Sequence, residues 1–419
     1  MQGSTLVRVD VPSRFNHADF EKVSTNGLGS VRGKTVIIGA IVVLVGVAYY
    51  LVLPQPLFDR PYSTVLESRD GQLLSASIAS DGQWRFPADN DVPDRFVKAL
   101  LAFEDKRFFY HPGVDPFSIA RALLQNVREG RIVSGGSTIS MQVIRLSRGS
   151  PPRTIFEKAL EMVLATRLEL SYSKKEILAL YAAHAPFGGN VVGLEAACWR
   201  YFGRSPDNLS WAEAATLAVL PNSPSLIHPG RNRDALRRKR DNLLHRLYLE
   251  GAIDSLAWAL GTAEPVPTVP RSLPRYARHL LGRIQKKGGR QQRTTSTIDF
   301  ALQRRVEEKV QQHHRRLRAN QINNAAVLVL DVETGNVLAY AGNVYGNGNH
   351  GEEVDIVAAP RSTGSVLKPI LYAAALNEGQ LLPKSLLPDI PVRLNGFAPE
   401  NFSREYDGAV PADEPSFAR

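Results

Sequence analysis

The stretch FEDKRFFYHPGVD (residues 103–115) links two amphipathic patterns and carries the first candidate catalytic group. Glu104 and Asp105 stand at the end of the helical pattern DRFVKALLAF (94–103), just before an aromatic loop that contains His111. Carboxylates beside aromatic surface are candidates for a raised pKa, which suits a general base. The alternative reading is a solvated acidic pair at the end of a helix.

A glycine-rich segment, SGGSTISMQ (134–142), comes next along the chain. Its two glycines allow close backbone approach, and Ser137 and Thr138 offer hydroxyls and amides to an anion. Three cations and a carboxylate follow, a set that suits a pyrophosphate leaving group and a second acidic role. They are Arg145, Arg153, Lys158 and Glu161. Lys158 and Glu161 share a helix face, so a surface ion pair of little energetic consequence is the alternative for these two.

Periodicity around these segments predicts a mainly helical domain between about residues 91 and 260. Apolar residues recur at helical spacing in 94–103, 116–129, 156–170, 174–183 and 212–219. Upstream, 54–90 alternates apolar and polar residues around Asp70-Gly71, which predicts a strand-rich stalk with a hairpin.

The chain changes character after this helical region. The proline-rich stretch 263–275 is typical of a linker or domain boundary. Residues 299–318 predict a charged amphipathic helix, and 325–340 predict two strands joined by a turn. The last part of the chain is therefore expected to be α+β.

Residues 35–53 form an uncharged apolar run of 19 residues. As a helix this run spans about 28 Å, close to one hydrocarbon core. Arg32 and Lys34 precede it, which favours a cytoplasmic N-terminus and places 59–419 outside. A cleaved signal peptide and a buried core helix are the competing interpretations, and the length and lack of a polar face favour an uncleaved anchor.

The chain is basic, with 51 Lys and Arg against 41 Asp and Glu, and its net charge is +10. Such a balance favours nucleic acid, anionic lipid or a phosphorylated substrate, although a solvated basic surface explains it equally. The basic cluster RNRDALRRKR (231–240) is open to the same two interpretations, an exposed helix face or contact with an anion. The single cysteine, Cys198, excludes intramolecular disulfides and a Cys-based zinc site.

A second nucleophile motif lies near the end of the chain, in PRSTGSVLKPILYA (360–373). Ser365 and Lys368 are one helical turn apart, so the amine can accept the hydroxyl proton if burial lowers its pKa. The spacing alone proves little, because Ser171 and Lys174 repeat it within the helical region.

Six segments taken in order carry a specific resemblance. They are EDKRFFYHPGVD, GGSTISMQ, RTIFEKALEMVLATRLEL, YSKKEILALY, APFGGNVVG and AEAATLAVLPNSPS. This series resembles the peptidoglycan glycosyltransferase (transglycosylase) domain of the class A penicillin-binding proteins. The forms APFGG, YFG and LAVLP are most similar to the 1C subtype.

The resemblance implies a lysozyme-like, mainly helical domain after one transmembrane helix, lying on the outer face of a bacterial cytoplasmic membrane. It implies lipid II and the growing glycan chain as substrates, other cell-wall synthesis proteins as possible partners, and no nucleic acid. Glu104 corresponds to the general base that activates the acceptor sugar 4-hydroxyl for inverting attack. Glu161 corresponds to a second acidic residue that positions substrate or supports a divalent metal (Mg or Mn). The substrate-binding positions that the resemblance implies are Asp105, Gly136, Ser137, Thr138, Gln142, Arg145, Arg153 and Lys158.

Three positions in two segments depart from the pattern of that family. Met141 stands where a second Gln is usual, and Ala182-Ala183 replace the usual Leu-Asn. The lost amide removes a local cap or a substrate contact, and turnover is expected to survive because the carboxylates remain.

The segment STGSVLKP resembles the nucleophile motif of the penicillin-binding transpeptidases, which implies Ser365 as acylated nucleophile and Lys368 as proton acceptor. Neither a Ser-x-Asn nor a Lys-Thr-Gly motif occurs in the 51 residues after Lys368. We therefore expect an incomplete transpeptidase domain without activity.

The sequence thus favours a membrane-anchored glycan polymerase over two alternatives, a muramidase that cleaves glycan and a non-catalytic cell-wall scaffold. The cations around the glycine-rich loop have no use in hydrolysis, and the intact carboxylates argue against a scaffold. The expected order is a cytoplasmic tail (1–34), an anchor (35–53), a strand-rich stalk (54–90), a glycosyltransferase domain (91–262), a linker (263–295) and an incomplete transpeptidase domain (296–419).

Overall fold

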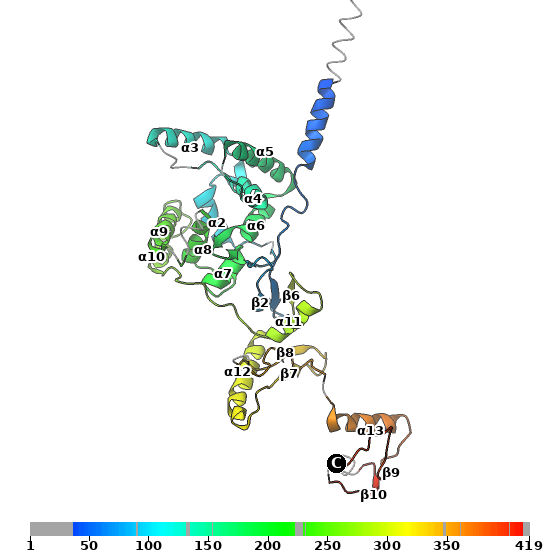
Figure 1. The fold of residues 1–419 in the computed structure, drawn as a ribbon. Coiled ribbons are helices and arrows are strands. Elements are labelled where there is room, and N and C mark those ends of the chain that lie inside the picture. The colour runs from blue at the N-terminus through cyan, green and yellow to red at the C-terminus, as the bar shows by residue number, and fades with distance from the viewer. Residues whose placement is uncertain are drawn as a thin grey trace, which may run out of the picture. The chain divides into compact units, whose positions relative to one another are not determined.

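The computed structural model describes residues 37–88, 91–130, 135–152, 154–222, 229–230, 232–346, 349–360, 362–401 and 403–413. The chain divides into two compact units, Met1–Glu353 and Val354–Arg419 (Figure 1).

The first unit begins with a helical segment at 37–51, whose side chains are mostly exposed. The first two residues of the expected anchor, 35 and 36, lie outside the described residues. Among the described helices, none combines the length and the apolarity needed to cross a membrane.

The stalk forms a small sheet in the order β2-β1-β6. Strands β1 (Thr64–Glu67) and β2 (Leu73–Ser77) pair antiparallel, and Gly71 in the turn between them has a φ of 72°. A left-handed backbone is what the Asp-Gly turn provides, so the predicted hairpin is confirmed.

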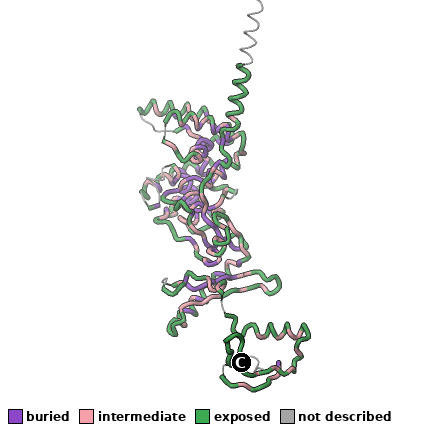
Figure 2. The backbone as a smooth tube through the Cα atoms, turned by 45° about the vertical axis from the view of Figure 1, so that its right-hand side comes forward, coloured by how far each residue is buried: buried purple, intermediate pink, exposed green. Residues whose placement is uncertain are grey.

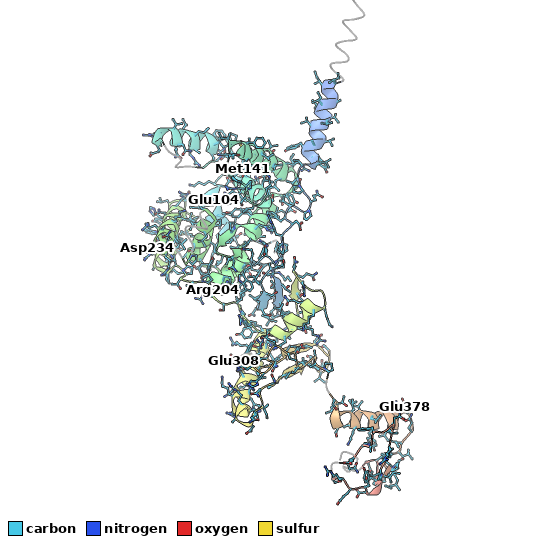
Figure 3. All side chains as sticks on the ribbon, in the orientation of Figure 1. Glu104, Met141, Arg204, Asp234, Glu308 and Glu378 are labelled. Atoms are coloured by element: carbon cyan, nitrogen blue, oxygen red, sulfur yellow. The ribbon has the colours of Figure 1, made fainter. Side chains whose placement is uncertain are left out.

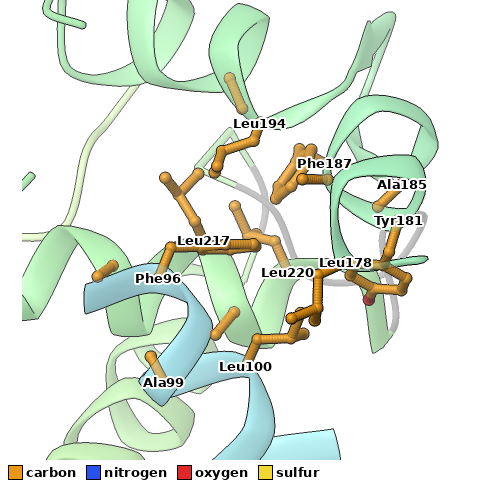
Figure 4. Packing of buried hydrophobic residues seen from close by; sticks show 14 of the residues in the cluster. Phe96, Ala99, Leu100, Leu178, Tyr181, Ala185, Phe187, Leu194, Leu217 and Leu220 are labelled. Atoms are coloured by element: carbon orange, nitrogen blue, oxygen red, sulfur yellow. The ribbon is translucent and has the colours of Figure 1, made fainter. Parts of the chain in front are cut away.

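The helical part of the unit follows the predicted periodicity closely. Its helices are α2 (Asp94–Glu104), α3 (Pro116–Glu129), α4 (Ile139–Ser147), α5 (Ile155–Ser171), α6 (Lys174–His184), α7 (Leu194–Tyr201), α8 (Trp211–Val219), α9 (Arg233–Leu249) and α10 (Ser255–Ala263). Most of them share one core, where Phe96 and Leu100 from α2 pack with Leu217 from α8 and Leu178 from α6 (Figure 4). The expectation of a mainly helical domain is confirmed.

Local signals set several helix ends. Asp115 caps α3 by accepting from the amide of Phe117, and Pro116 occupies the first turn of the helix, where a missing N–H costs nothing. Ser173 and Ser210 each form a capping box with the glutamate three residues later. The helices therefore begin where the sequence supplies a partner for the first amides.

The small strands β3 (Trp84–Arg85), β4 (Pro186–Gly188) and β5 (Val191–Val192) form a second sheet, in the order β3-β5-β4. Residues expected to act as a linker, 263–295, contribute helix α11 (Arg278–Lys286) and strand β6 (Arg293–Thr295). Strand β6 runs parallel to β1, and Arg293 forms ion pairs with Glu67 in β1 and Glu195 in α7. This ion cluster ties the stalk sheet to the helical core.

The predicted helix and strand pair after the linker are confirmed. Helix α12 (Phe300–Leu317) packs on the hairpin of β7 (Val327–Leu330) and β8 (Val337–Ala341). Gln303 holds the two together, because its amide donates to the carbonyl of Tyr340 at 3.0 Å and accepts from the amide of Tyr340 at 2.7 Å.

The second unit contains η5 (Gly364–Leu367), α13 (Lys368–Asn377) and the antiparallel pair β9 (Leu386–Asp389) and β10 (Gly408–Pro411). Within its described residues only Ala412 is buried. Figure 2 shows this contrast, with buried backbone concentrated in the first unit and exposed backbone through most of the second.

Candidate active site

Glu104 ends helix α2 and lies beside α4 (Figure 3). Its Oε2 atom accepts a hydrogen bond from Nε2 of Gln142 in α4, at 2.8 Å. Its Oε1 atom is buried and has no hydrogen-bond partner among the described residues. One carboxylate oxygen is therefore held, and the other lies inside the protein without a partner.

Burial raises the pKa of Glu104 above its usual value of 4.5, and the adjacent charge of Asp105 adds to the rise. Three contacts oppose this shift, namely the hydrogen bond from Gln142, the positive charge of Lys239 and the amide of Asn222. The cause that dominates is desolvation, which disfavours the charged form of a carboxylate. A carboxylate with a raised pKa, in a partly polar setting, has the properties of a general base.

Lys239 in α9 and Asn222 in η3 (Leu220–Asn222) belong to this site, and the sequence analysis did not single them out. Nζ of Lys239 donates to Oδ1 of Asn222 at 2.9 Å. Burial lowers the pKa of Lys239, and the charge of Glu104 counteracts that effect. The signal that could have found Lys239 is its place on α9, next to the inward-facing Leu236 and Arg240.

The basic cluster 231–240 is thus neither a uniform exposed face nor a uniform binding patch. Arg240 is fully buried and donates to the carbonyls of Glu264 and Thr262, whereas Arg237 and Arg238 are exposed. Helical periodicity turns every third or fourth residue of such a run inward, and a buried guanidinium survives there because backbone carbonyls satisfy it.

Asp105 faces the interior, next to the aromatic loop. Its carboxylate lies 3.1 Å from Nε2 of His111 and accepts from the backbone amide of Ile139, the first residue of α4, at 3.0 Å. The carboxylate therefore fixes the loop and the N-terminus of α4, where a negative charge is favourable. Asp105 thereby sets the position of the helix that carries Gln142; its direct contact with substrate stays a prediction.

The glycine-rich segment runs close to other backbone. A Cβ on Gly136 would lie 2.8 Å from Cα of Ile119, so only glycine fits there. Thr138 is buried and caps α4, donating to the carbonyl of Gly113 at 2.6 Å and accepting from the amide of Met141 at 3.2 Å. Ser137 is half-buried.

Met141 packs into the hydrophobic core with none of its surface exposed. The side chain at position 141 is therefore part of the core cluster. The departure from the family pattern replaces a polar group in the interior, and it leaves the amide that contacts the candidate base in place.

Helix α4 connects the candidate base to a second carboxylate. Arg145 lies one turn after Gln142, and its Nε is 3.9 Å from Oε1 of Glu161 in α5. Glu161 is 9% exposed, and Lys158, one turn before it, is exposed. Arg153 lies outside the described residues.

Helix α4 therefore connects the two carboxylates, because its Gln142 contacts Glu104 of α2 and its Arg145 contacts Glu161 of α5. Lys158 lies one turn before Glu161 on α5. In such an arrangement the buried base can remove a proton from one reacting group. The nearby cations can stabilise the negative charge that develops on the other reacting group.

Ser365 and Lys368 lie in the second unit. Ser365 is exposed in η5, and Lys368 is the half-buried first residue of α13, so the predicted spacing of one turn is present. No residue of α13 is buried.

The divalent metal that the resemblance implies stays a prediction. Within the described part of the chain, no group of three or more His, Cys, Asp or Glu residues is arranged to hold a metal ion. Mg²⁺ is usually bound through one or two carboxylates together with substrate phosphates, and Glu161 supplies one such carboxylate.

Comparison with known proteins gives two family matches. Residues 70–248 match the Transglycosylase family, and residues 325–407 match the penicillin binding protein transpeptidase domain. The first match includes the whole segment from Glu104 to Lys239, and the second includes Ser365 and Lys368.

Several relatives match across most of the chain, and three of them follow. Penicillin-binding protein 1C of Escherichia coli (strain K12) is 39% identical over 363 residues, covering 86% of this chain and 47% of the relative. Penicillin-binding protein 1B of Haemophilus influenzae is 30% identical over 379 residues, covering 83% of this chain and 48% of the relative. Penicillin-binding protein 2D of Bacillus subtilis is 30% identical over 372 residues, covering 84% of this chain and 53% of the relative.

The chain spans about half the length of these relatives. The two family matches occur in the order that the motifs predict, and the relative named 1C agrees with the forms of the APFGG and LAVLP segments. The chain belongs to the class A penicillin-binding proteins, 1C subtype.

Proposed function

We propose that this chain is a peptidoglycan glycosyltransferase that polymerises lipid II into glycan strands. The observation that carries the proposal is the buried carboxylate of Glu104, held by Gln142 on the helix that also presents Arg145. The match of residues 70–248 to the Transglycosylase family supports the same reaction class.

In the proposed reaction, Glu104 removes the proton from the 4-hydroxyl of the acceptor sugar. That oxygen attacks the anomeric carbon of the growing chain from the face opposite the lipid pyrophosphate, so the new C–O bond forms as the bond to phosphate breaks, with inversion. Arg145 and Lys158 stabilise the charge that develops on the departing diphosphate. The proton stays on Glu104 until solvent removes it.

Glu161 has two compatible roles in the proposed reaction. Through its ion pair with Arg145 it orients the guanidinium toward the diphosphate. If Mg²⁺ or Mn²⁺ takes part, Glu161 is the described carboxylate that would hold it, and the metal would add positive charge at the phosphates.

We also propose that residues 35–53 anchor the chain in the cytoplasmic membrane, with the glycosyltransferase region outside. The carbonyl of Tyr50 accepts from the guanidinium of Arg167 in α5, and Tyr49 contacts Thr166 at 2.9 Å, so the helical segment 37–51 is docked onto the glycosyltransferase helices. Nearby helices expose large apolar side chains, which suits a lipid surface. These side chains are Phe117, Leu124 and Val127 of α3 and Ile155 and Phe156 of α5.

The transpeptidase segment is proposed to be inactive in this chain. Ser365 is exposed and Lys368 is only half-buried, whereas activation of the hydroxyl by a neutral lysine needs a more fully desolvated amine.

The test is polymerisation of fluorescent lipid II by the full detergent-solubilised chain, with products separated on a gel. Wild type should give a ladder, and Glu104→Gln should lose about 10²–10⁴-fold in rate. Glu308→Gln, an exposed carboxylate of α12, is the matched control and should keep the wild-type rate. Equal ladders from Glu104→Gln and wild type would contradict the proposal, no ladder from any protein would favour a scaffold, and cleavage of preformed glycan would favour a muramidase.

A further inference from the structure

Tyr181 in α6 is one of the largest fully buried side chains of the chain, with 1% of its surface exposed. It lies in the hydrophobic core together with Leu178 of the same helix and Leu100 of α2 (Figure 4). Its hydroxyl has no hydrogen-bond partner among the described residues. Buried tyrosine hydroxyls normally form a hydrogen bond, so a partner for this hydroxyl is expected.

The second buried polar atom without a described partner in this region is Oε1 of Glu104. Helix α6 packs against α4, which holds Glu104 through Gln142, and Leu100 lies one helical turn before Glu104 on α2. Tyr181 and Leu100 belong to one core cluster, so the two unpartnered atoms lie in the same buried region. Burial raises the pKa of Tyr181 well above 10, and the charge of Glu104 adds to this rise. Tyr181 therefore keeps its proton, and the carboxylate offers an acceptor.

We propose that Tyr181 is a positioning residue for Glu104, whose hydroxyl donates to Oε1 of the ionised carboxylate, directly or through one buried water. This inference rests on the proposed function. With the proposed hydrogen bond, each oxygen of the Glu104 carboxylate has a hydrogen-bond donor, Gln142 for Oε2 and Tyr181 for Oε1. The inner oxygen is then fixed, so the outer oxygen faces the acceptor hydroxyl with a free lone pair.

The hydrogen bond also stabilises the charged form of the base. Other groups that act on Glu104 are Lys239 from α9, Asn222 from η3 and Asp105, the next residue in the chain. None of these is altered when the Tyr181 hydroxyl alone is removed. Loss of that donor should therefore raise the pKa of Glu104 without removing the base.

The pH dependence of lipid II polymerisation tests this role. Tyr181→Phe should move the acidic limb of the kcat/KM profile upward by about half to one pH unit, with only a few-fold loss above the limb. Tyr201→Phe is the matched control, because Tyr201 is equally buried but donates to the carbonyl of Phe187 at 3.0 Å. An unmoved limb in Tyr181→Phe, or an equal shift in both variants, would overturn the proposal.

A second measurement does not depend on polymerisation. Thermal unfolding of wild type, Tyr181→Phe, Glu104→Met and the double variant at pH 7 forms a double-mutant cycle, in which Met removes both acceptor oxygens. The change in Tm caused by Tyr181→Phe should differ by at least about 2 °C between the wild-type background and the Glu104→Met background. Additive changes would overturn the proposed contact, whichever reaction the chain catalyses.

The wild-type protein provides a final check if Tyr181→Phe does not accumulate as folded protein. A crystal structure at neutral pH should place the Tyr181 hydroxyl within hydrogen-bond distance of Oε1 of Glu104, or place one water between them. A hydroxyl that bonds elsewhere would overturn the inference.

Discussion

Glu104 and Ser365 are the candidate reactive groups of the two units, and their surroundings differ in kind. Glu104 accepts a hydrogen bond from Gln142 of α4, which lies 38 residues later in the chain. The charge of Lys239 in α9 lowers the pKa of Glu104 and opposes the effect of burial. Ser365 stands in an exposed turn before α13, a helix with no buried residue.

The difference shows that the spacing of two residues by one helical turn brings their side chains together but does not remove them from water. A turn of helix places Ser365 near Lys368, just as it places Gln142 near Arg145. In the first unit long-range packing removes water from the reactive group, and desolvation is what shifts a pKa toward a catalytic value. Around Ser365 the described residues of the second unit provide no such packing. The described residues of the first unit therefore enclose their candidate reactive group, and those of the second unit leave Ser365 exposed.

After the loss of Glu104 itself, the largest effect is expected from removing the cation beside the second carboxylate. Arg145→Met should lower the rate of lipid II polymerisation by about 10²–10³-fold, because it removes charge that stabilises the leaving diphosphate. Gel-based initial rates measure the loss. Arg148→Met removes a neighbouring exposed cation that pairs with Glu157, and its rate should stay within about three-fold of wild type. Similar losses in both variants would mean that the region acts only as a general basic surface.

The next effect concerns the stability of the first unit in acid. His184 stacks on Phe58 with ring centroids 3.5 Å apart, and burial lowers its pKa from 6.5 to about 4. The folded state therefore binds the proton more weakly than the unfolded chain. The stability that the neutral ring contributes is complete above pH 6.5 and falls by about 3 kcal/mol as the pH drops toward 4.

Calorimetric unfolding between pH 7 and pH 4 measures this fall. His184→Phe keeps an aromatic ring against Phe58 and removes the titrating group, so the contribution of His184 to the pH dependence should disappear. The same slope in both proteins would show that other groups cause the acid sensitivity.

A smaller effect is expected at Lys239. Its charge lowers the pKa of Glu104, so Lys239→Met should raise that pKa and shift the acidic limb of the polymerisation profile upward by about one pH unit. Arg238→Met, an exposed neighbour on the same helix, should leave the limb in place. A limb that moves in neither variant would place Lys239 outside the site.

The smallest effect is expected in the second unit. Incubation with fluorescent penicillin should give no labelling above that of Ser365→Ala, and this substitution should leave lipid II polymerisation unchanged. A labelled band that depends on Ser365 would show that an exposed motif is sufficient for acylation, and the contrast between the two regions would fail.

Elements that depend on interactions between residues close in the sequence could be predicted from the sequence. Elements that depend on contacts between distant residues could not. Helices such as α2 and α6 were predicted within one residue at their ends, because amphipathic spacing and caps are local. The parallel pairing of β6 with β1 was not predicted, since its partners are separated by more than 200 residues and leave no local pattern.

The same distinction applies to the site. Glu104 and Arg145 were identified from motifs, but the sequence could not indicate that Gln142 bonds Glu104 or that Asp105 turns inward to hold the amide of Ile139. Lys239 was hidden in a basic run whose members look alike, and only the orientation of α9 separates it from its exposed neighbours.

The central claim is that a buried carboxylate at position 104 acts as the base, and the pH dependence of kcat/KM for lipid II polymerisation by the wild-type chain tests it most directly. The account predicts an acidic limb with a midpoint above 4.5, and no such limb in the residual activity of Glu104→Gln. A midpoint at or below 4.5, or the same limb in Glu104→Gln, would contradict it.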